Sequence, residues 1–87
     1  MNLGAIGKKI KENLSYPYIA RRRGQEGKAL VAFLVGLDGS VKQVRVMKSS
    51  GHQALDREAK RAIQAAAPFP APGREISLTL PVTFKLE

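Results

Sequence analysis

The sequence contains no cysteine and no tryptophan, a single histidine and few aromatic residues. Without cysteine the chain can form no disulfide, no thiolate metal site and no cysteine nucleophile. Its longest apolar run, residues 29–37, is far too short to span a membrane. Residues 1–15 lack a continuous apolar block and so do not match a secretory signal, and we expect a mature domain or a fragment of a longer protein.

Acidic residues are also scarce, with 7 against 15 basic residues and a net charge of +8. This excess indicates an acidic partner, such as a carboxylate-bearing peptide, an anionic cell-wall polymer, a lipid surface or nucleic acid. The same charge would also serve solubility alone, so composition does not choose among these alternatives. With 87 residues, 44% of them hydrophobic, the chain is predicted to form one globular domain over residues 1–87.

A short amphipathic helix is predicted at the N-terminus, over residues 1–15. Ile6, Ile10 and Leu14 recur every four residues and form one apolar stripe. Pro17 disfavours the helical conformation in the residue before it and so ends the helix. The arginine- and glycine-rich stretch that follows is predicted to be a polar connector.

Residues 28–48 predict a β-hairpin. The first strand is apolar on both faces, which is typical of a buried central strand. Asp38-Gly39 is typical of a two-residue type I′ turn, in which both central residues have positive φ. The apolar alternation of the return strand loses its phase near Lys42 and Gln43, so we expect a bulge there.

The second half of the chain predicts a helix over residues 53–67 and a strand over residues 75–87. The helix presents one apolar stripe, made of Leu55, Ala59, Ala62, Ile63 and Ala66. The strand alternates apolar and polar residues and should overhang its neighbours. The predicted class is therefore α+β, a small antiparallel three-stranded sheet with a helix packed on one face, preceded by a short N-terminal helix.

Candidates for catalysis are confined to one turn, where Ser49, Ser50, His52 and Asp56 occur together. A catalytic triad requires a pocket, an oxyanion hole and residues converging from separate elements. We interpret this cluster as a helix-capping turn, in which serine hydroxyls accept backbone N–H groups. The spacing of possible ligands predicts no metal or cofactor site, and we expect no enzyme.

Pro81 indicates that one edge of the last strand is unpaired. Proline is tolerated in a sheet mainly where its missing N–H would face an open edge. Because backbone donors alternate along a strand, Thr79, Thr83 and Lys85 would then offer N–H groups to the same edge. This edge is either a docking ladder for a guest strand or an ordinary edge that proline and lysine protect from aggregation.

Five segments together resemble the C-terminal domain of the TonB family. They are YPYIA (16–20), EG (26–27), LDGSVKQVRVMKSSG (37–51), LDREAKRAI (55–63) and PFPAP (68–72). The resemblance covers about residues 14–87. It implies the receptor-binding domain of an energy transducer, coupled through an inner-membrane anchor to a proton-driven motor.

The resemblance also implies a binding site. In this family the TonB box of an outer-membrane receptor pairs as an added strand with the last strand of the domain. Tyr16 and Pro17 match the motif near the receptor contact. The accepting strand is matched by Ser77, Thr79, Pro81, Thr83 and Lys85. Arg21, Arg22 and Arg23 either attract acidic residues of the receptor or only solvate a turn.

By the same resemblance, we expect the domain to lie in the periplasm and to serve uptake of iron–siderophore, cobalamin or similar substrates. Its partners would be the TonB box and, through the anchor region, the inner-membrane motor proteins. No cofactor and no nucleic acid is expected. An open edge also permits a strand-exchanged homodimer.

Two other interpretations compete with this one. A TolA-like domain has a similar small α+β shape and also serves the cell envelope, but it should lack the SSG and LD segments. A basic nucleic-acid-binding domain would suit the charge of +8. It would require exposed aromatic residues on the sheet, whereas Phe33 and Phe84 are expected to be buried.

Overall fold

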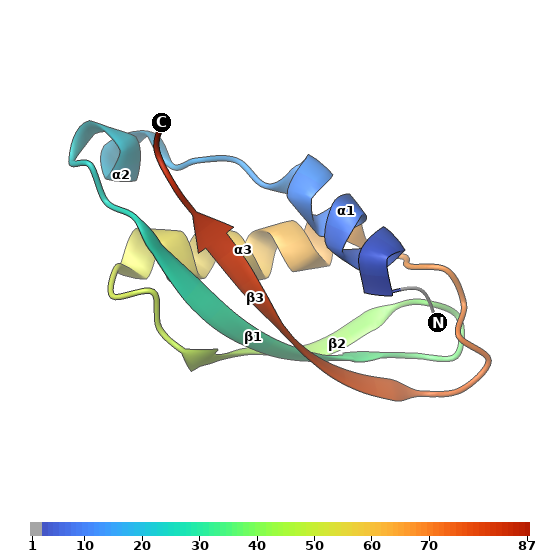
Figure 1. Ribbon diagram of the computed structural model, residues 1–87. Helices are drawn as coiled ribbons and strands as arrows, with labels where there is room; N and C mark the ends of the chain where they lie inside the picture. The colour runs from blue at the N-terminus through green and yellow to red at the C-terminus, as the bar shows by residue number, and fades with distance from the viewer. Residues whose placement is uncertain (1–2) are drawn as a thin grey trace.

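Helices and strands form two layers in the computed structural model, which describes residues 3–87 (Figure 1). In chain order they are α1 (Leu3–Asn13), α2 (Tyr18–Arg22), β1 (Gly27–Val35), β2 (Val41–Lys48), α3 (Gln53–Ala66) and β3 (Ile76–Phe84). This arrangement confirms the predicted α+β class. Residues 1 and 2, which the sequence assigns to the first helix, lie outside the described part of the chain.

The strands pair antiparallel in the order β2-β1-β3, so the apolar β1 is central, as predicted. β1 and β3 pair along their whole length, from Gly27 opposite Phe84 to Val35 opposite Ile76. β3 and β1 are each 9 residues long, so β3 is shorter than the predicted range of residues 75–87. Residues 85–87 continue beyond the last pair without a partner in β1.

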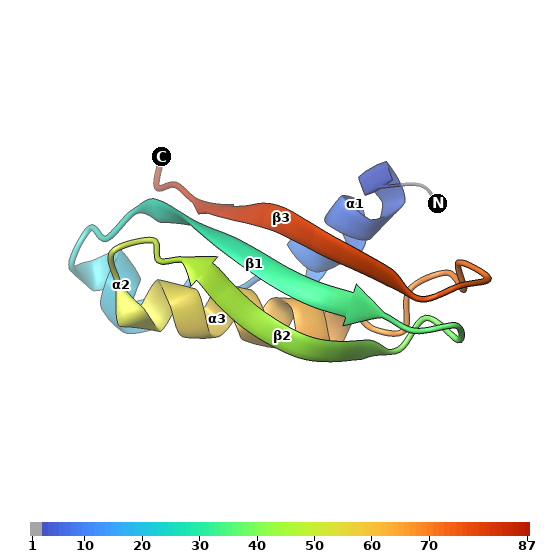
Figure 2. The same cartoon turned by 90° about the horizontal axis from the view of Figure 1, so that it is seen from below.

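Helix α3 covers one face of the sheet, and α1 packs against α3 on the side of β3 (Figures 1 and 2). Figure 2 views the sheet from its opposite, uncovered face. The predicted stripe of α3 is fully buried, namely Leu55, Ala59, Ala62, Ile63 and Ala66. It packs with Ile6 and Ile10 of α1 and with Val31 and Phe33 of β1, and burial of these side chains is the main driving force for the fold.

The loop between β1 and β2 differs from the predicted type I′ turn. Gly36 N–H donates to the Ser40 carbonyl at 2.8 Å and Gly39 N–H to the Gly36 carbonyl at 2.9 Å, which makes a three-residue loop. Gly39 has positive φ (+89°), whereas Asp38 does not. The Gly39 carbonyl also accepts the Phe69 N–H at 2.9 Å, so the segment after α3 is fastened to this loop.

The predicted bulge in β2 is confirmed. Gln43 has φ of 52°, and the register of β1 and β2 shifts between Ala32 and Leu34. A second shift lies between Leu30 and Val31. These irregularities explain why the apolar alternation of β2 loses its phase in the sequence.

The predicted connector after Pro17 is partly wrong, because its beginning folds into the short helix α2. Pro17 stands at the N-cap with φ of −59°, and its carbonyl accepts the Arg21 N–H at 2.9 Å. Ala20 is completely buried and anchors the turn. A helix of 5 residues is too short to show a periodic stripe, so the sequence pattern did not indicate it.

Within residues 3–87, every helix is too short or too polar to cross a bilayer.

Candidate functional site

The outer edge of β3 pairs with no strand among the described residues. Leu86 N–H, two residues beyond the strand, donates to the Glu26 carboxylate, on the side of β1. Backbone donors alternate between the two sides of an extended chain, so those of Val82 and Phe84 also point toward β1. By the same alternation, the N–H groups of Thr83 and Lys85 and the nitrogen of Pro81 point to the open edge.

Helix α1 lies on the β3 side of the sheet (Figure 1), and a groove of about 500 Å³ lies between α1 and this edge. Its walls are Gly7, Lys11 and Leu14 on one side and Pro81, Val82, Thr83, Lys85 and Glu87 on the other. A Cβ atom added at Gly7 would meet nothing within 4 Å. The groove thus leaves room beside the exposed amides of β3.

Sequence reasoning missed the α1 wall of this groove. The predicted stripe of Ile6, Ile10 and Leu14 marks residues that pack on the core, and of these only Leu14 also lines the groove. Gly7 and Lys11 are four residues apart on the exposed side of the same helix, which is the spacing of neighbours on one helix face. The sequence therefore shows that Gly7 and Lys11 share one helix face. Only the packing of α1 beside β3 shows that this face lines a groove.

Helix α1 is held in place from both the core and the surface. Ile6 and Ile10 are 1% and 5% exposed. The Lys9 ammonium donates to the Pro68 carbonyl at 2.6 Å and lies 5.9 Å from the centre of the Phe69 ring. The wall opposite β3 is therefore a packed element of the fold.

At its C-terminal end the groove continues into a second hollow of about 310 Å³. Lys11, Leu14, Thr83 and Lys85 line both hollows, and Tyr16 and Arg21 line the second. Lys11, Arg21 and Lys85 make this end of the groove basic, which suits a guest with an acidic residue there.

Tyr16 lines the second hollow and contacts the last residue of β3. Its ring lies edge-on against Phe84, with centroids 5.6 Å apart, and its hydroxyl donates to the Gln25 carbonyl. The Arg21 guanidinium lies 5.2 Å from the centre of the ring. Partial burial and the nearby Glu26 carboxylate raise the pKa of Tyr16, against the opposing effect of Arg21. Tyr16 thus stabilises the strand end and lines the groove.

Pro17 does not join this groove. It lines a separate shallow hollow with residues of α3, among them Ala54, Arg57 and Glu58. Of the predicted Tyr-Pro pair, the structure thus places Tyr16 beside the end of β3 and Pro17 beside α3, and receptor contact by Pro17 stays a prediction. Pro17 has an extended backbone, with φ of −59° and ψ of 134°. Side chains of consecutive residues in an extended chain point to opposite sides, so Tyr16 and Pro17 contact different elements.

Ser77 and Thr79 are exposed on β3 but lie outside the groove. They stand opposite Leu34 and Ala32, toward the start of the strand. The groove accompanies β3 only from Pro81 onward. The structure thus brings the second half of the predicted accepting strand next to α1 and leaves the first half open.

The three arginines of the predicted basic segment are all exposed. Arg21 and Arg22 belong to α2, and Arg22 Nη1 donates to the Tyr18 hydroxyl at 3.3 Å. Across residues 3–87, no acidic side chain forms an ion pair with Arg21, Arg22 or Arg23. Of the three, only Arg21 lines the second hollow at the end of the groove beside β3.

The serine-rich turn before α3 is a structural cap. Gly51 N–H donates to Ser49 Oγ at 3.0 Å, and Ser50 N–H donates to Asp56 Oδ1 at 2.8 Å. Partial burial raises the pKa of Asp56, but hydrogen bonds from Ser49 and Ser50 lower it overall. His52 makes no side-chain capping bond, so the serine–histidine–aspartate combination lacks the geometry of a triad.

The described residues offer neither a metal centre nor a base-stacking platform on the sheet. No group of three His, Asp or Glu side chains between residues 3 and 87 is placed to hold a metal ion. Phe33 and Phe84 are each 2% exposed and face the core. Their rings therefore cannot stack on nucleic-acid bases.

Comparison with known proteins relates the whole fold to one family. The family described as Gram-negative bacterial TonB protein C-terminal matches residues 12–86. The chain is 40% identical over 79 residues to Protein TonB of Helicobacter pylori strain J99, which covers 90% of this chain and 28% of that protein. It is 36% identical over 90 residues to Protein TonB of Haemophilus influenzae, which covers 95% of this chain and 32% of that protein.

Solved structures of TonB C-terminal domains have the same fold as this chain. The solution structure of the Helicobacter pylori TonB C-terminal domain has a TM-score of 0.90 at 37% identity, covering 98% of this chain and 80% of that chain. The Pseudomonas aeruginosa TonB C-terminal domain has a TM-score of 0.72 at 29% identity, covering 85% and 79%. The chain spans between 28% and 33% of the length of the curated relatives it matches.

Proposed function

Because this chain belongs to the family of Gram-negative TonB C-terminal domains, we propose that it binds a periplasmic segment of a TonB-dependent outer-membrane receptor as an added strand on β3. The observation that carries the proposal is the unpaired outer edge of β3 beside the groove under α1. The guest backbone would lie between Gly7 and Thr83 and pair with the amides that point outward.

The affinity of such a complex would depend on more than the backbone ladder. Four or five added hydrogen bonds contribute only about 2–6 kcal/mol net, and Pro81 leaves a gap among them. The basic residues at the end of the groove, Lys11, Arg21 and Lys85, supply further attraction for an acidic residue of the guest.

The proposed role in the cell is transmission of force, and no catalytic step enters it, because the TonB family consists of non-enzymatic energy transducers. A pull along β3 loads several hydrogen bonds in shear at once, so a modest affinity can carry a transient load. In a longer protein, an inner-membrane anchor and proton-driven motor would supply the force for uptake of iron–siderophore, cobalamin or similar substrates. The periplasm is the corresponding location.

Replacing the donor at the centre of the open ladder tests strand addition. We expect Thr83→Pro to weaken binding of a TonB-box peptide about 2- to 10-fold, the worth of one backbone hydrogen bond. The fold should persist, because the Thr83 N–H points away from β1. Titration of the isotope-labelled domain followed by NMR measures both effects.

Thr83→Val is the matched control, since it changes the same side chain and keeps the backbone donor. It should bind the peptide as the unmodified chain does. Equal affinity of the proline variant, with an intact spectrum, would contradict strand addition at β3.

A further inference from the structure

The opposite edge of the sheet carries a second groove. We propose that the groove between β2 and α3 is a docking site for an extended acidic polypeptide segment, separate from the β3 edge. Strand β2 is the other edge of the sheet in the described chain, and it lies alongside α3 (Figure 2). The hollow between them measures about 470 Å³.

The length of this groove suits an extended chain. Along α3 it is lined by Gln53, Asp56, Arg57, Lys60, Arg61 and Gln64, and Val46 of β2 lies on the opposite side. The eleven steps from Gln53 to Gln64 rise roughly 16 Å along the helix, and an extended chain advances about 3.3 Å per residue. The groove therefore accommodates roughly five residues of a guest.

Positive charge is in excess in this groove, where Arg57, Lys60 and Arg61 line it together with one carboxylate, Asp56. Arg57 is exposed and Lys60 is half-buried, and neither forms an ion pair in the described part of the chain. The nearest carboxylates are already engaged. Asp56 accepts hydrogen bonds from Ser49 and Ser50, and Glu58 pairs with Arg61 at 2.6 Å.

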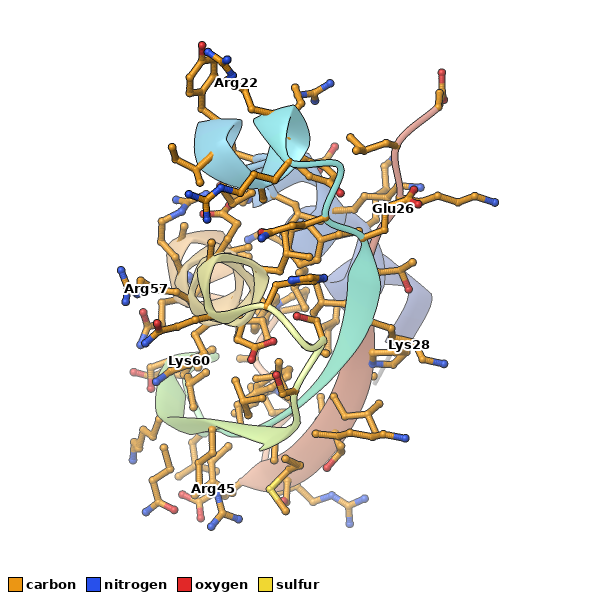
Figure 3. All side chains as sticks on the ribbon, turned by 90° about the vertical axis from the view of Figure 1, so that its left-hand side faces the viewer. Arg22, Glu26, Lys28, Arg45, Arg57 and Lys60 are labelled. Atoms are coloured by element: carbon orange, nitrogen blue, oxygen red, sulfur yellow. The ribbon has the colours of Figure 1, made fainter. Side chains whose placement is uncertain are left out.

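A further basic residue lies on the other face of the same strand. Arg45 stands opposite Ala32, whereas Val31 of β1 faces the core and stands opposite Val46. Alternation therefore turns Arg45 toward the uncovered face of the sheet. Figure 3 shows Arg45, Arg57 and Lys60 on the β2 side of the molecule and Lys28 on the opposite side.

Basic residues on both faces of the β2 edge select the occupant. Side chains of a guest lying along β2 would alternate between Arg57 and Lys60 on one face and Arg45 on the other. A second copy of this chain would bring equally basic edges together, which costs free energy. An acidic segment instead meets opposite charge on both faces.

The probe for this site is an acetylated and amidated nine-residue peptide in which glutamate alternates with threonine. NMR titration of the full chain should shift the amides of Val46, Arg57, Lys60 and Gln64 and should leave the Gly7 amide unaffected. Binding should weaken as salt is raised, because the contacts are solvent-accessible ion pairs. The same peptide with glutamine in place of glutamate should bind at least about tenfold more weakly.

Lys60→Glu and Lys28→Glu make a matched pair, because both reverse one lysine and change the net charge equally. We expect Lys60→Glu to weaken binding of the peptide about tenfold and Lys28→Glu to change it by less than about twofold. Thr83→Pro should leave this binding unchanged. Equal weakening by both lysine variants, or shifts confined to the β3 groove, would overturn the proposal.

Discussion

At the residue scale, single side chains and even single Cβ atoms decide the local geometry. Gly39 illustrates this best. Its φ is +89°, and a Cβ atom added there would lie 1.9 Å from the Phe69 carbonyl oxygen. Glycine is required at this position for both its conformation and the close approach of the segment after α3.

Gly39→Ala should therefore lower the free energy of unfolding by more than about 2 kcal/mol, because it combines an unfavourable backbone conformation with a steric clash. Gly24→Ala is the control. Gly24 also has positive φ (+65°), but a Cβ atom there meets nothing within 4 Å, so we expect a loss of only about 1 kcal/mol. Urea unfolding followed by circular dichroism measures both, and equal losses would show that the contact with Phe69 contributes nothing.

At the element scale, the position of α1 beside β3 makes an open sheet edge into a groove. Lys11 of α1 and Leu14, the residue after its end, line the groove, while Ile6 and Ile10 hold the helix on the core. The helix thus contacts the core on one face and lines the groove on another. Gly7 lines the groove and does not stabilise the helix, since glycine is a poor helix former.

Gly7→Leu tests this division of tasks. Leucine should raise the stability of the domain by up to about 0.8 kcal/mol, because it is the better helix former. Its side chain would enter the groove and weaken binding of a TonB-box peptide about tenfold or more through loss of guest contacts.

Gly4→Leu is the matched control for this change. Gly4 lies in the same helix, is exposed and does not line the groove. Thermal unfolding and peptide titration of the two variants give the required pair of measurements. Similar peptide affinities for both would show that the guest does not lie beside α1.

At the scale of the whole molecule, basic charge surrounds an elongated fold. The Cα principal-axis extents are 42 × 21 × 16 Å, and the net charge is +8. The two proposed docking edges, β3 and β2, lie on opposite sides of the sheet. Few carboxylates balance this charge, so their protonation state bears on global stability.

The pKa values of three carboxylates are lowered. At Asp38 hydrogen bonds from Ser40 are the cause. At Asp56 and Glu58 burial raises the pKa, but hydrogen bonds, including the Arg61 guanidinium on Glu58, lower it overall. A carboxylate whose pKa is lower in the folded state stabilises the fold above its unfolded pKa, and this contribution is lost as pH falls through the folded value.

We therefore expect the free energy of unfolding to fall as pH is lowered from about 5 to about 2, because the unfolded carboxylates titrate at about pH 4 and the folded ones below that. Glu58→Gln should make this fall shallower, because the variant lacks one of the titrating groups. Urea unfolding at several pH values measures the slope. An unchanged slope in the variant would show that Glu58 contributes no pH-dependent stability.

Much of this fold could be predicted from local sequence patterns, but the site could be predicted only in part. The stripe of α3 and the bulge at Gln43 follow from periodicity, which each segment carries in itself. The three-residue loop at Gly39 depends on Phe69, far away in the chain. Pro17 separates from Tyr16 because α3 and β3 approach the Tyr-Pro segment from different sides.

The sequence by itself determined the order of the main elements, the faces that enter the core and the presence of a proline in the last strand, because side-chain periodicity is a local property. Tertiary structure decided that α1 lies beside β3, that β2 and α3 enclose a second basic groove, and that Arg45 and Lys60 lie on one side of the molecule. Those features depend on which distant surfaces pack together, and packing is set by the fit of the whole core.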